Sequence, residues 1–327
     1  MNLIFPGLEY ILFFVGIFLL IKGADYLIDG ASSLAKRFGI SSLVIGLTVI
    51  AFGTTLPELS VNIIAALENA NEIAFGNIIG SNLSNILLVL GITASMYKIK
   101  IHYSTTWKEI PFSFLSILVL FILANKSTIE GSNVFQLTRI DGLILLLFFS
   151  IFIYYAFLIV RRSQAETETK KTEIPKINVP LTWLMILGGS VALYIGGTWT
   201  VNGAVFIAEK LGLSEFLISA TIIAIGTSLP ELVTSIKAVL KQKVDIAIGN
   251  IIGANIFNIL WILGITALIN PINIPSFINT DIIILGIVTL FLFFTLATDK
   301  KHELERWQGI LFILAYIAYI IFLIIRG

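Results

Sequence analysis

The chain has 327 residues, of which 57% are hydrophobic and 13% are charged, and its net charge is +1 at pH 7. A soluble protein of 36.0 kDa cannot hide so much apolar surface from water, so the composition predicts an all-α integral membrane protein. The balanced charge excludes nucleic-acid binding through a basic surface. The chain has no cysteine, which excludes disulfides, thiolate metal sites and cysteine nucleophiles.

Ten stretches are long and apolar enough to cross a bilayer as helices, each of which needs about 20 residues. In chain order they cover residues 8–33, 41–67, 73–96, 106–124, 139–160, 182–207, 215–240, 246–270, 279–298 and 307–325. The first lacks the basic start and cleavage pattern of a signal peptide, so we expect it to be a span. The charged stretch 161–180 is predicted to be a solvated linker that is too short to form a domain.

Basic residues are distributed unevenly between the two sides of this predicted bundle. When the ten helices cross the membrane in turn, 16 of the 21 Lys and Arg residues fall on one side and 4 on the other. Cytoplasmic loops carry the excess of basic residues, so we expect a multi-pass protein of the cell membrane with a cytoplasmic linker and extracellular termini. The remaining basic residue, Lys22, lies inside the first span. We expect it to form a local ion pair with Asp25 or Asp29, near the inner end of that span.

The two halves of the chain are related by an internal repeat. A shift of 173 positions superposes residues 23–92 on residues 196–265, with 33 identities in 70 positions. Each half holds an odd number of predicted spans, so the second half must enter the membrane from the opposite side. We therefore expect two inverted five-helix repeats, residues 1–160 and 181–327, joined by the linker 161–180. Inverted repeats build the substrate sites of transporters near the bilayer midplane.

Each repeat carries a Pro–Glu pair in the middle of an apolar span, in AFGTTLPEL (residues 51–59) and AIGTSLPEL (residues 224–232). The proline should break the helix and free a backbone carbonyl group. Glu58 and Glu231 follow the prolines at a depth where an ionised side chain costs about 3 kcal/mol. One lysine in the first span cannot neutralise both, so a bound cation is the partner that we expect.

Hydroxyl and amide groups accompany these glutamates. Thr54 precedes Glu58 by one helical turn and can face the same cavity, and the second repeat has the same arrangement. In the following span of each repeat, Asn85 and Asn258 are predicted ligands. The other amides there, at Asn77 and Asn250, fit helix packing as well as ligation.

These groups supply oxygen ligands only, because both histidines, His102 and His302, lie in polar connecting segments. Oxygen ligands favour hard cations, and a flexible all-protein cage favours Ca²⁺ over Mg²⁺. An empty site with two carboxylates is costly to move through a water-poor state, which predicts exchange and not leak. A proton-coupled exchanger is the alternative. A cation channel is disfavoured by the inverted repeat, and an enzyme by the lack of a nucleophile–base pair.

The paired GT[TS]LPE and GNIIG[SA]N segments resemble the alpha repeats of the cation/calcium exchanger superfamily, in its sodium/calcium exchanger-like branch of prokaryotic type. The resemblance implies a Na⁺/Ca²⁺ antiporter that works by alternating access, in which the first and sixth helices slide against a fixed bundle. Its partners would be inorganic cations and the lipid bilayer, with no cofactor, no protein partner and a monomeric state. The cation ligands that it implies are Glu58, Glu231, Thr54, Thr227, Ala51, Ala224, Thr55, Ser228, Ser81, Asn85 and Asn258.

The chain departs from the family pattern at two positions. Ala254 lacks the hydroxyl group of the equivalent Ser81, which removes one candidate Na⁺ ligand. Asn258 is neutral where some relatives carry Asp. The short linker also lacks the large regulatory domain of animal exchangers.

Overall fold

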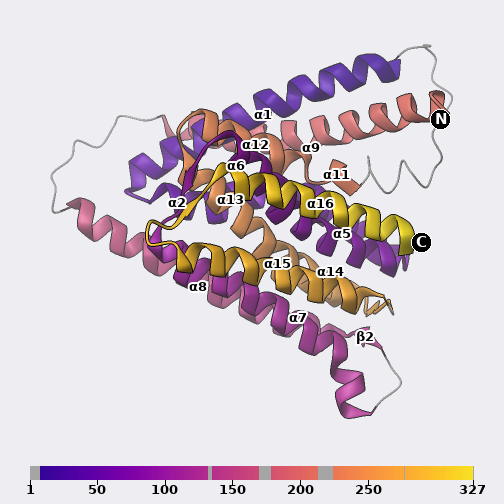
Figure 1. Cartoon of the computed structure of the whole chain (residues 1–327). Helices are drawn as coiled ribbons and strands as arrows, with labels where there is room; N and C mark the ends of the chain where they lie inside the picture. Colours follow the sequence, from indigo (N-terminus) through magenta and orange to yellow (C-terminus); the bar gives the residue numbers. More distant parts are fainter. Residues whose placement is uncertain (1–7, 132–134, 169–177, 213–223, 276, 327) are drawn as a thin grey trace.

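The computed structural model describes residues 8–131, 135–168, 178–212, 224–275 and 277–326 (Figure 1). In the first half the helices are α1 (Leu8–Phe38), α2 (Ser42–Ile45), α3 (Ala51–Thr54), α4 (Leu56–Leu67), α5 (Asn71–Leu83), α6 (Leu90–Met96), α7 (Ile110–Glu130) and α8 (Arg139–Glu168). In the second half they are α9 (Val179–Lys210), α11 (Ala224–Gly226), α12 (Leu229–Leu240), α13 (Val244–Ile256), α14 (Leu263–Ile269), α15 (Ile278–Thr298) and α16 (Arg306–Arg326).

Wider π-helical turns and short strands complete the described fold. The π-helical turns are η1 (Gly46–Ile50), η2 (Ser84–Val89), η3 (Thr105–Glu109) and η5 (Phe257–Ile262). The strands are β1 (Ile99–Lys100), β2 (Gln136–Leu137), β3 (Ile272–Asn273) and β4 (Glu303–Leu304). The helices run roughly along one direction, and α1 begins at the same end of the molecule at which α16 ends (Figure 1).

Eight of the described helical segments are long and apolar enough to cross a membrane, and a bent pair makes a ninth. The bent pair joins Ser42–Thr54 to Leu56–Leu67 at an angle of 47°. The helix break predicted at Pro57 is therefore present. The remaining predicted span, residues 215–240, begins outside the described residues, and its described part is α11 and α12. The sequence thus predicted an all-helical membrane protein correctly.

The charged stretch after the fifth span, which is predicted to be a solvated linker, is helical in its first described part. Its first residues, up to Glu168, continue α8 as a helix. The sequence there, RRSQAETE, is rich in good helix formers, so the helix extends beyond the apolar segment. The apolar periodicity could predict where the span ends but not where the helix ends.

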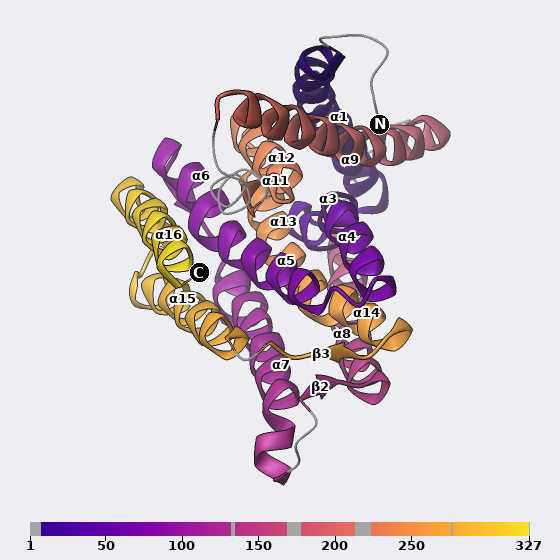
Figure 2. The same cartoon turned by 90° about the vertical axis from the view of Figure 1, so that its right-hand side faces the viewer.

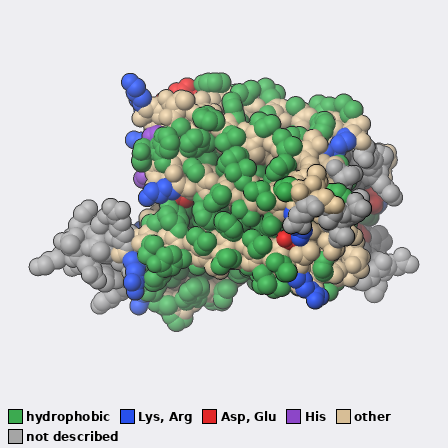
Figure 3. All heavy atoms as spheres, turned by 90° about the horizontal axis from the view of Figure 1, so that it is seen from below, with side chains coloured by type: hydrophobic (Ala, Val, Ile, Leu, Met, Phe, Trp, Pro, Cys, Tyr) green, Lys and Arg blue, Asp and Glu red, His purple; other side chains and the backbone are tan. Residues whose placement is uncertain are grey.

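The most buried spans lie in the middle of the bundle, where α5 and α13 are seen in Figure 2. In the apolar 18-residue stretch of each span, 72% of the residues are buried in Ile73–Met96 and 83% in Val244–Ile269. The corresponding share in Arg139–Arg161 is 17%. The face shown in Figure 3 is covered by a broad apolar surface, with Lys and Arg side chains near its edges. This distribution is that of a protein with a tightly packed interior and a lipid-facing exterior.

Helices α1 and α9 lie side by side and apart from most of the bundle (Figures 1 and 2). They pack antiparallel through glycines, since a Cβ atom built on Gly16 would lie 2.9 Å from the Gly196 carbonyl oxygen. A Cβ atom built on Gly23 would lie 2.9 Å from the carbonyl oxygen of Gly189. These two contacts are reciprocal, because Gly189 and Gly196 are the repeat equivalents of Gly16 and Gly23. The backbones approach each other so closely that no side chain fits between them.

The strands connect the two halves in the same reciprocal way. β1 pairs antiparallel with β4, and β2 pairs antiparallel with β3. The loop after the third span of each half therefore pairs with the loop between the last two spans of the other half. The backbone hydrogen bonds next to the strands are reciprocal as well. The amide of Ile101 donates to the carbonyl oxygen of His302 at 2.8 Å, and the amide of its equivalent, Ile274, donates to the carbonyl oxygen of Phe135 at 2.9 Å.

Two adjacent glycines of α9 test the close packing. We expect Gly189→Ala to destabilise the protein by about 1–3 kcal/mol, because a Cβ atom there would lie 2.7 Å from the backbone nitrogen of Leu27. Gly188→Ala should be neutral or slightly stabilising, because nothing described lies within 4 Å of its added Cβ atom. Thermal unfolding of the two purified variants measures the difference. Equal melting temperatures would contradict the packing argument.

Candidate cation-binding site

Each Pro–Glu pair begins a new helix after a break. Thr55 has φ −84° and ψ 6°, and its equivalent Ser228 has φ −84° and ψ 4°, both outside the helical region. The prolines occupy the first turns of α4 and α12, where no intrahelical donor is needed. The glutamates therefore lie in the first turn, where the positive end of the helix dipole favours a carboxylate. The two breaks have almost the same geometry, as the repeat predicts.

Glu58 is completely buried. Its Oε1 accepts a hydrogen bond of 2.8 Å from the hydroxyl group of Ser81 in α5. The same hydroxyl oxygen lies 3.0 Å from the hydroxyl oxygen of Ser228, just before α12. Oε2 of Glu58 has no hydrogen-bond partner in the described part of the chain. Ser81 thus joins the glutamate of the first repeat to the helix break of the second.

Glu231 is equally buried, and neither of its carboxylate oxygens has a hydrogen-bond partner among the described residues. The difference from Glu58 has a clear cause: the equivalent of Ser81 is Ala254, which cannot donate. Thr54 lies beside the Glu231 carboxylate, but its hydroxyl group donates to Oδ1 of Asn250 at 2.9 Å. The Glu58 carboxylate is close enough to repel Glu231. Two like charges therefore share one buried region, which a cation would stabilise.

Four asparagines from η2, η5 and the ends of α5 and α13 form a reciprocal network between the repeats. The Nδ2 of Asn85 donates to Asn255 Oδ1 at 3.0 Å, and the Nδ2 of Asn258 donates to Asn82 Oδ1 at 2.9 Å. The side chains of Asn82 and Asn255 also donate to each other's backbone carbonyl groups, at 3.2 and 3.3 Å. The Oδ1 atoms of Asn85 and Asn258 remain buried without partners in the described chain. The two predicted ligands thus keep an acceptor oxygen free.

The remaining amides hold helices together. Asn77 donates to Oδ1 of Asn62 at 2.6 Å and to the carbonyl oxygen of Glu58 at 3.2 Å. Its equivalent, Asn250, donates to Ser235 Oγ at 3.2 Å and also accepts from Thr54. Their side-chain hydrogen bonds favour helix packing over cation binding, which the sequence left open.

Two features of this region are not among the residues and turns predicted from the sequence. The first is the pair Asn62 and Ser235, one turn after the glutamates, which accept the bonds of the helix-joining amides. Their spacing of four residues from the glutamates could have indicated them. The second is the π-helical turns that contain Asn85 and Asn258, for which the sequence carries no signal. π-Helical turns often mark functional sites, because the extra residue redirects side chains.

The other predicted ligands are Thr55, Ala51, Thr227 and Ala224. Thr55 donates to the Ala51 carbonyl oxygen at 2.9 Å, so this carbonyl group and this hydroxyl group are already engaged with each other. Thr227 is partly buried at the second helix break and lines cavities described below. Ala224 begins α11, where the described backbone resumes. The structure thus brings Glu58, Glu231, Thr54, Ser81 and Ser228 together between the repeats. Asn85 and Asn258 lie in the asparagine network that starts at Asn82, the residue after Ser81.

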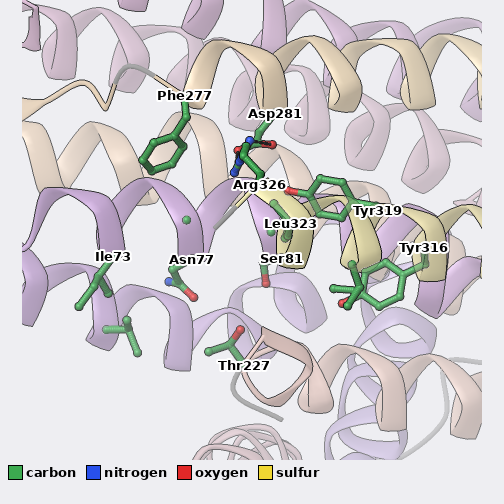
Figure 4. Close-up of a pocket in the computed structure, with 14 residues that line it drawn as sticks. Ile73, Asn77, Ser81, Thr227, Phe277, Asp281, Tyr316, Tyr319, Leu323 and Arg326 are labelled. Atoms are coloured by element: carbon green, nitrogen blue, oxygen red, sulfur yellow. Dashed lines mark hydrogen bonds and ion pairs between the residues drawn. The ribbon is translucent and has the colours of Figure 1, made fainter. Parts of the chain in front are cut away.

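A cavity of about 410 Å³ reaches this region from the end of the bundle where α15 begins and α16 ends. Ser81 and Thr227 lie at one end of the cavity, and Asp281 and Arg326 lie at the other (Figure 4). A second cavity of about 260 Å³, between α4 and α9, also includes Thr227. Water and small ions can therefore approach the hydroxyl groups beside Glu58.

Two glycines of α5, Gly76 and Gly80, form part of the larger cavity. Their equivalents in α13 are covered, since a Cβ atom built on Gly249 would lie 2.5 Å from the Leu43 carbonyl oxygen. One built on Gly253 would lie 2.6 Å from the Leu47 carbonyl oxygen. The surroundings of the candidate site therefore differ between these two equivalent helix faces.

Asp25 and Asp29 of α1 are paired, but not with Lys22 as predicted. Asp25 lies 3.2 Å from Lys237 and 3.0 Å from Lys241, and Asp29 lies 2.9 Å from Lys241. A further pair, of 3.1 Å, joins Asp29 to Lys243. Lys22 is exposed instead, because it lies on another face of the helix. Burial alone would lower the pKa of Lys241, but its hydrogen bonds to the two aspartates raise that pKa above 10.5.

Comparison with known proteins agrees with this geometry. The family model described as "Sodium/calcium exchanger protein" matches residues 8–158 and 181–325. The chain belongs to the sodium/calcium exchanger family. It is 36% identical to the putative antiporter CaxA of Alkalimonas amylolytica over 312 residues, which cover 93% of this chain and 95% of that protein. It is 30% identical to the sodium/calcium exchanger MaX1 of Methanosarcina acetivorans in an alignment of 350 positions, which covers 96% of this chain and 98% of that protein.

A solved structure of the sodium-calcium exchanger NCX_Mj, soaked with zero Na⁺ and Ca²⁺, superposes with a TM-score of 0.79. The two chains are 31% identical, and the match covers 97% of this chain and 99% of that one. The resemblance predicted from the paired GT[TS]LPE segments is therefore confirmed. The chain is a multi-pass integral membrane protein with the exchanger fold.

The ion pairs between α1 and α12 permit a test by salt. We expect Asp25→Asn/Asp29→Asn to lower the melting temperature by a few degrees at low ionic strength, because each partly exposed pair contributes about 1 kcal/mol at most. The loss should shrink in 1 M salt, where the Debye length is about 3 Å. The equivalent uncharged positions, changed as Thr198→Ala/Asn202→Ala, serve as the control, with an effect independent of salt. A loss that is the same at both ionic strengths would refute an electrostatic origin.

Proposed function

We propose that this protein is a secondary active antiporter that exchanges Ca²⁺ for Na⁺ by alternating access. Glu58 and Glu231 are its paired cation ligands near the bilayer midplane. The observation that carries the proposal is a set of buried acceptor oxygens without hydrogen-bond partners among the described residues, at Glu58, Glu231, Asn85 and Asn258. Buried acceptors without a donor are costly in a protein, and a cation satisfies several of them at once.

The chemistry of these oxygens supports the choice of ions. Carboxylate and amide oxygens in a flexible cage suit Ca²⁺, and the described residues contain no cluster of three or more His, Cys, Asp or Glu that would favour a transition metal. The two carboxylates match the charge of one Ca²⁺ ion or of two Na⁺ ions. The hydroxyl groups of Ser81, Ser228 and Thr227 and the backbone at Ala51 and Ala224 complete the proposed ligand set. The names of the relatives, a sodium/calcium exchanger among them, support the same pair of ions.

The proposed architecture is ten spans in two inverted five-helix repeats, residues 1–160 and 181–327, with the linker 161–180 between them. The reciprocal strand pairs and asparagine bonds support it, because they relate equivalent residues of the two halves. α1 begins at the same end of the molecule at which α16 ends, which supports an even number of spans (Figure 1). The distribution of the basic residues supports extracellular termini and a cytoplasmic linker. The protein acts as a monomer in the cell membrane and needs no cofactor.

Proton-coupled Ca²⁺ exchange is the second candidate, and Ala254 is the observation that favours it. Ala254 is fully buried and adds no hydroxyl group where the first repeat has Ser81. A second-repeat half-site with fewer oxygen ligands is less suited to Na⁺ than to a proton on Glu231.

Ion flux into proteoliposomes tests the proposal. We expect vesicles loaded with Na⁺ to take up ⁴⁵Ca²⁺ when diluted into Na⁺-free buffer, because the outward Na⁺ gradient drives exchange. Glu58→Gln and Glu231→Gln should each reduce this uptake by about 100-fold or more, since each removes a charged ligand of the buried cation. Glu68→Gln, the same change at an exposed position just after α4, should have no effect.

Parallel vesicles that carry only a proton gradient separate the two candidates. Uptake that ignores Na⁺ but follows the proton gradient, and that is lost in both glutamine variants, would keep the site and replace the coupling ion. Full uptake in either glutamine variant would overturn the proposed site itself.

A further inference from the structure

A second buried carboxyl group lies outside the candidate site, at the start of α7. Glu109 is fully buried, and its Oε1 accepts a short hydrogen bond from the hydroxyl group of Tyr155 in α8. Its Oε2 has no hydrogen-bond partner among the described residues. The ion pairs found in the described chain all involve other acids. The negative charge of Glu109 is therefore not balanced by any of the described basic side chains.

Three buried hydroxyl groups accompany this carboxyl group. Thr105, Thr106 and Ser113 are at most 1% exposed, and their hydroxyl oxygens also lack hydrogen-bond partners in the described chain. Thr105, Glu109 and Ser113 follow one another at intervals of four residues, so they share one helix face. Each such orphaned buried group is unfavourable. Four orphaned oxygens within nine residues point to a ligand that can satisfy them together.

The second repeat shows how the same position is neutralised without a ligand. Glu109 lies ten residues after Ile99 of β1, and Asp281 lies nine residues after Ile272 of β3, the repeat equivalent of Ile99. Asp281 is also buried, but both of its oxygens accept hydrogen bonds of 2.9 Å from Arg326. The pair is seen in Figure 4. A guanidinium group therefore supplies the positive charge at this position of the second repeat.

The hydroxyl groups are present only where this arginine is absent. The second repeat is one residue shorter between its strand and its acid, so Glu109 aligns with Asp281. In this alignment Thr105, Thr106 and Ser113 correspond to Phe277, Ile278 and Leu285. All three of these are apolar. One repeat thus combines an acid, an arginine and apolar neighbours, and the other combines an acid, three hydroxyl groups and no basic partner in the described chain.

We propose that Glu109, Thr105, Thr106 and Ser113 bind one Na⁺ ion, which takes the place that the Arg326 guanidinium group has beside Asp281. A single carboxylate matches a single positive charge, and oxygen ligands suit an alkali-metal ion. Protonation of Glu109 would neutralise the carboxylate, but its single O–H group would leave at least two of the three hydroxyl oxygens unsatisfied. This site is separate from Glu58 and Glu231, and it holds its ion without transporting it.

Thermal unfolding of the full-length protein in detergent tests the site in a Glu58→Gln/Glu231→Gln background, which disables the proposed transport site. We expect NaCl to raise the melting temperature of this background above that in choline chloride of equal ionic strength, with saturation, because a bound ion stabilises the folded state. Adding Glu109→Gln should abolish the Na⁺ dependence. Adding Ser113→Ala should raise the half-saturating Na⁺ concentration by about tenfold, as expected for the loss of one ligand to a charged group.

Ser116→Ala is the matched control on the same helix. Ser116 is buried as well, but its hydroxyl group donates to the carbonyl oxygen of Ser113 at 2.6 Å. Its loss should lower the melting temperature equally in both salts. A Na⁺ dependence that survives Glu109→Gln would overturn the proposal, as would a background whose melting temperature follows pH and ignores Na⁺. If the Glu109 variant does not fold, an unchanged half-saturating concentration in Ser113→Ala and in Thr105→Val would overturn it equally.

Discussion

Two carboxyl groups buried in the middle of an apolar bundle impose the constraint on which the rest of this protein depends. Glu58 and Glu231 have no basic partner among the described residues, and their mutual repulsion makes the empty, ionised site unfavourable. The surrounding elements reduce this cost in part. Each glutamate lies in the first turn of a helix that restarts after a break, and Ser81 donates to one of them. What remains is a deficit of positive charge that mobile cations can supply.

The internal repeat explains both the regularity of the candidate site and its exceptions. Equivalent asparagines bond across the repeats in reciprocal pairs, so their free acceptor oxygens arise twice from the same geometry. Single substitutions then break the symmetry. The change from Ser81 to Ala254 leaves both oxygens of Glu231 without a donor, where Glu58 lacks only one. The two half-sites have the same backbone geometry but different hydrogen-bond donors. They can therefore hold different ions, or the same ion with different affinity.

Most of the helices, and the burial of both glutamates of the candidate site, could be predicted from the sequence. The apolar stretches gave the helices, and the repeated Pro–Glu segments gave the helix break and both glutamates, because burial of charge and loss of an amide donor are local consequences of residue type. Partners could not be predicted in the same way. The aspartates of α1 pair with lysines more than 200 residues away, and not with nearby Lys22, because helix packing decides which faces meet. The π-helical turns at Asn85 and Asn258 depend on tertiary contacts as well.

The contact between α1 and α9 suits the proposed exchange cycle, in which these two helices slide together against the bundle. Glycines at their crossing bring the two backbones into direct contact, so α1 and α9 can move as one unit while they remain free to slide against the other helices. The ion pairs of α1 restrain this freedom at one end only, because the residues equivalent to Asp25 and Asp29 are the uncharged Thr198 and Asn202. Inverted repeats would otherwise give the two end states similar energies. A one-sided set of ion pairs between α1 and α12 adds stability to the state in which it forms, so the cations must supply the difference when the protein switches.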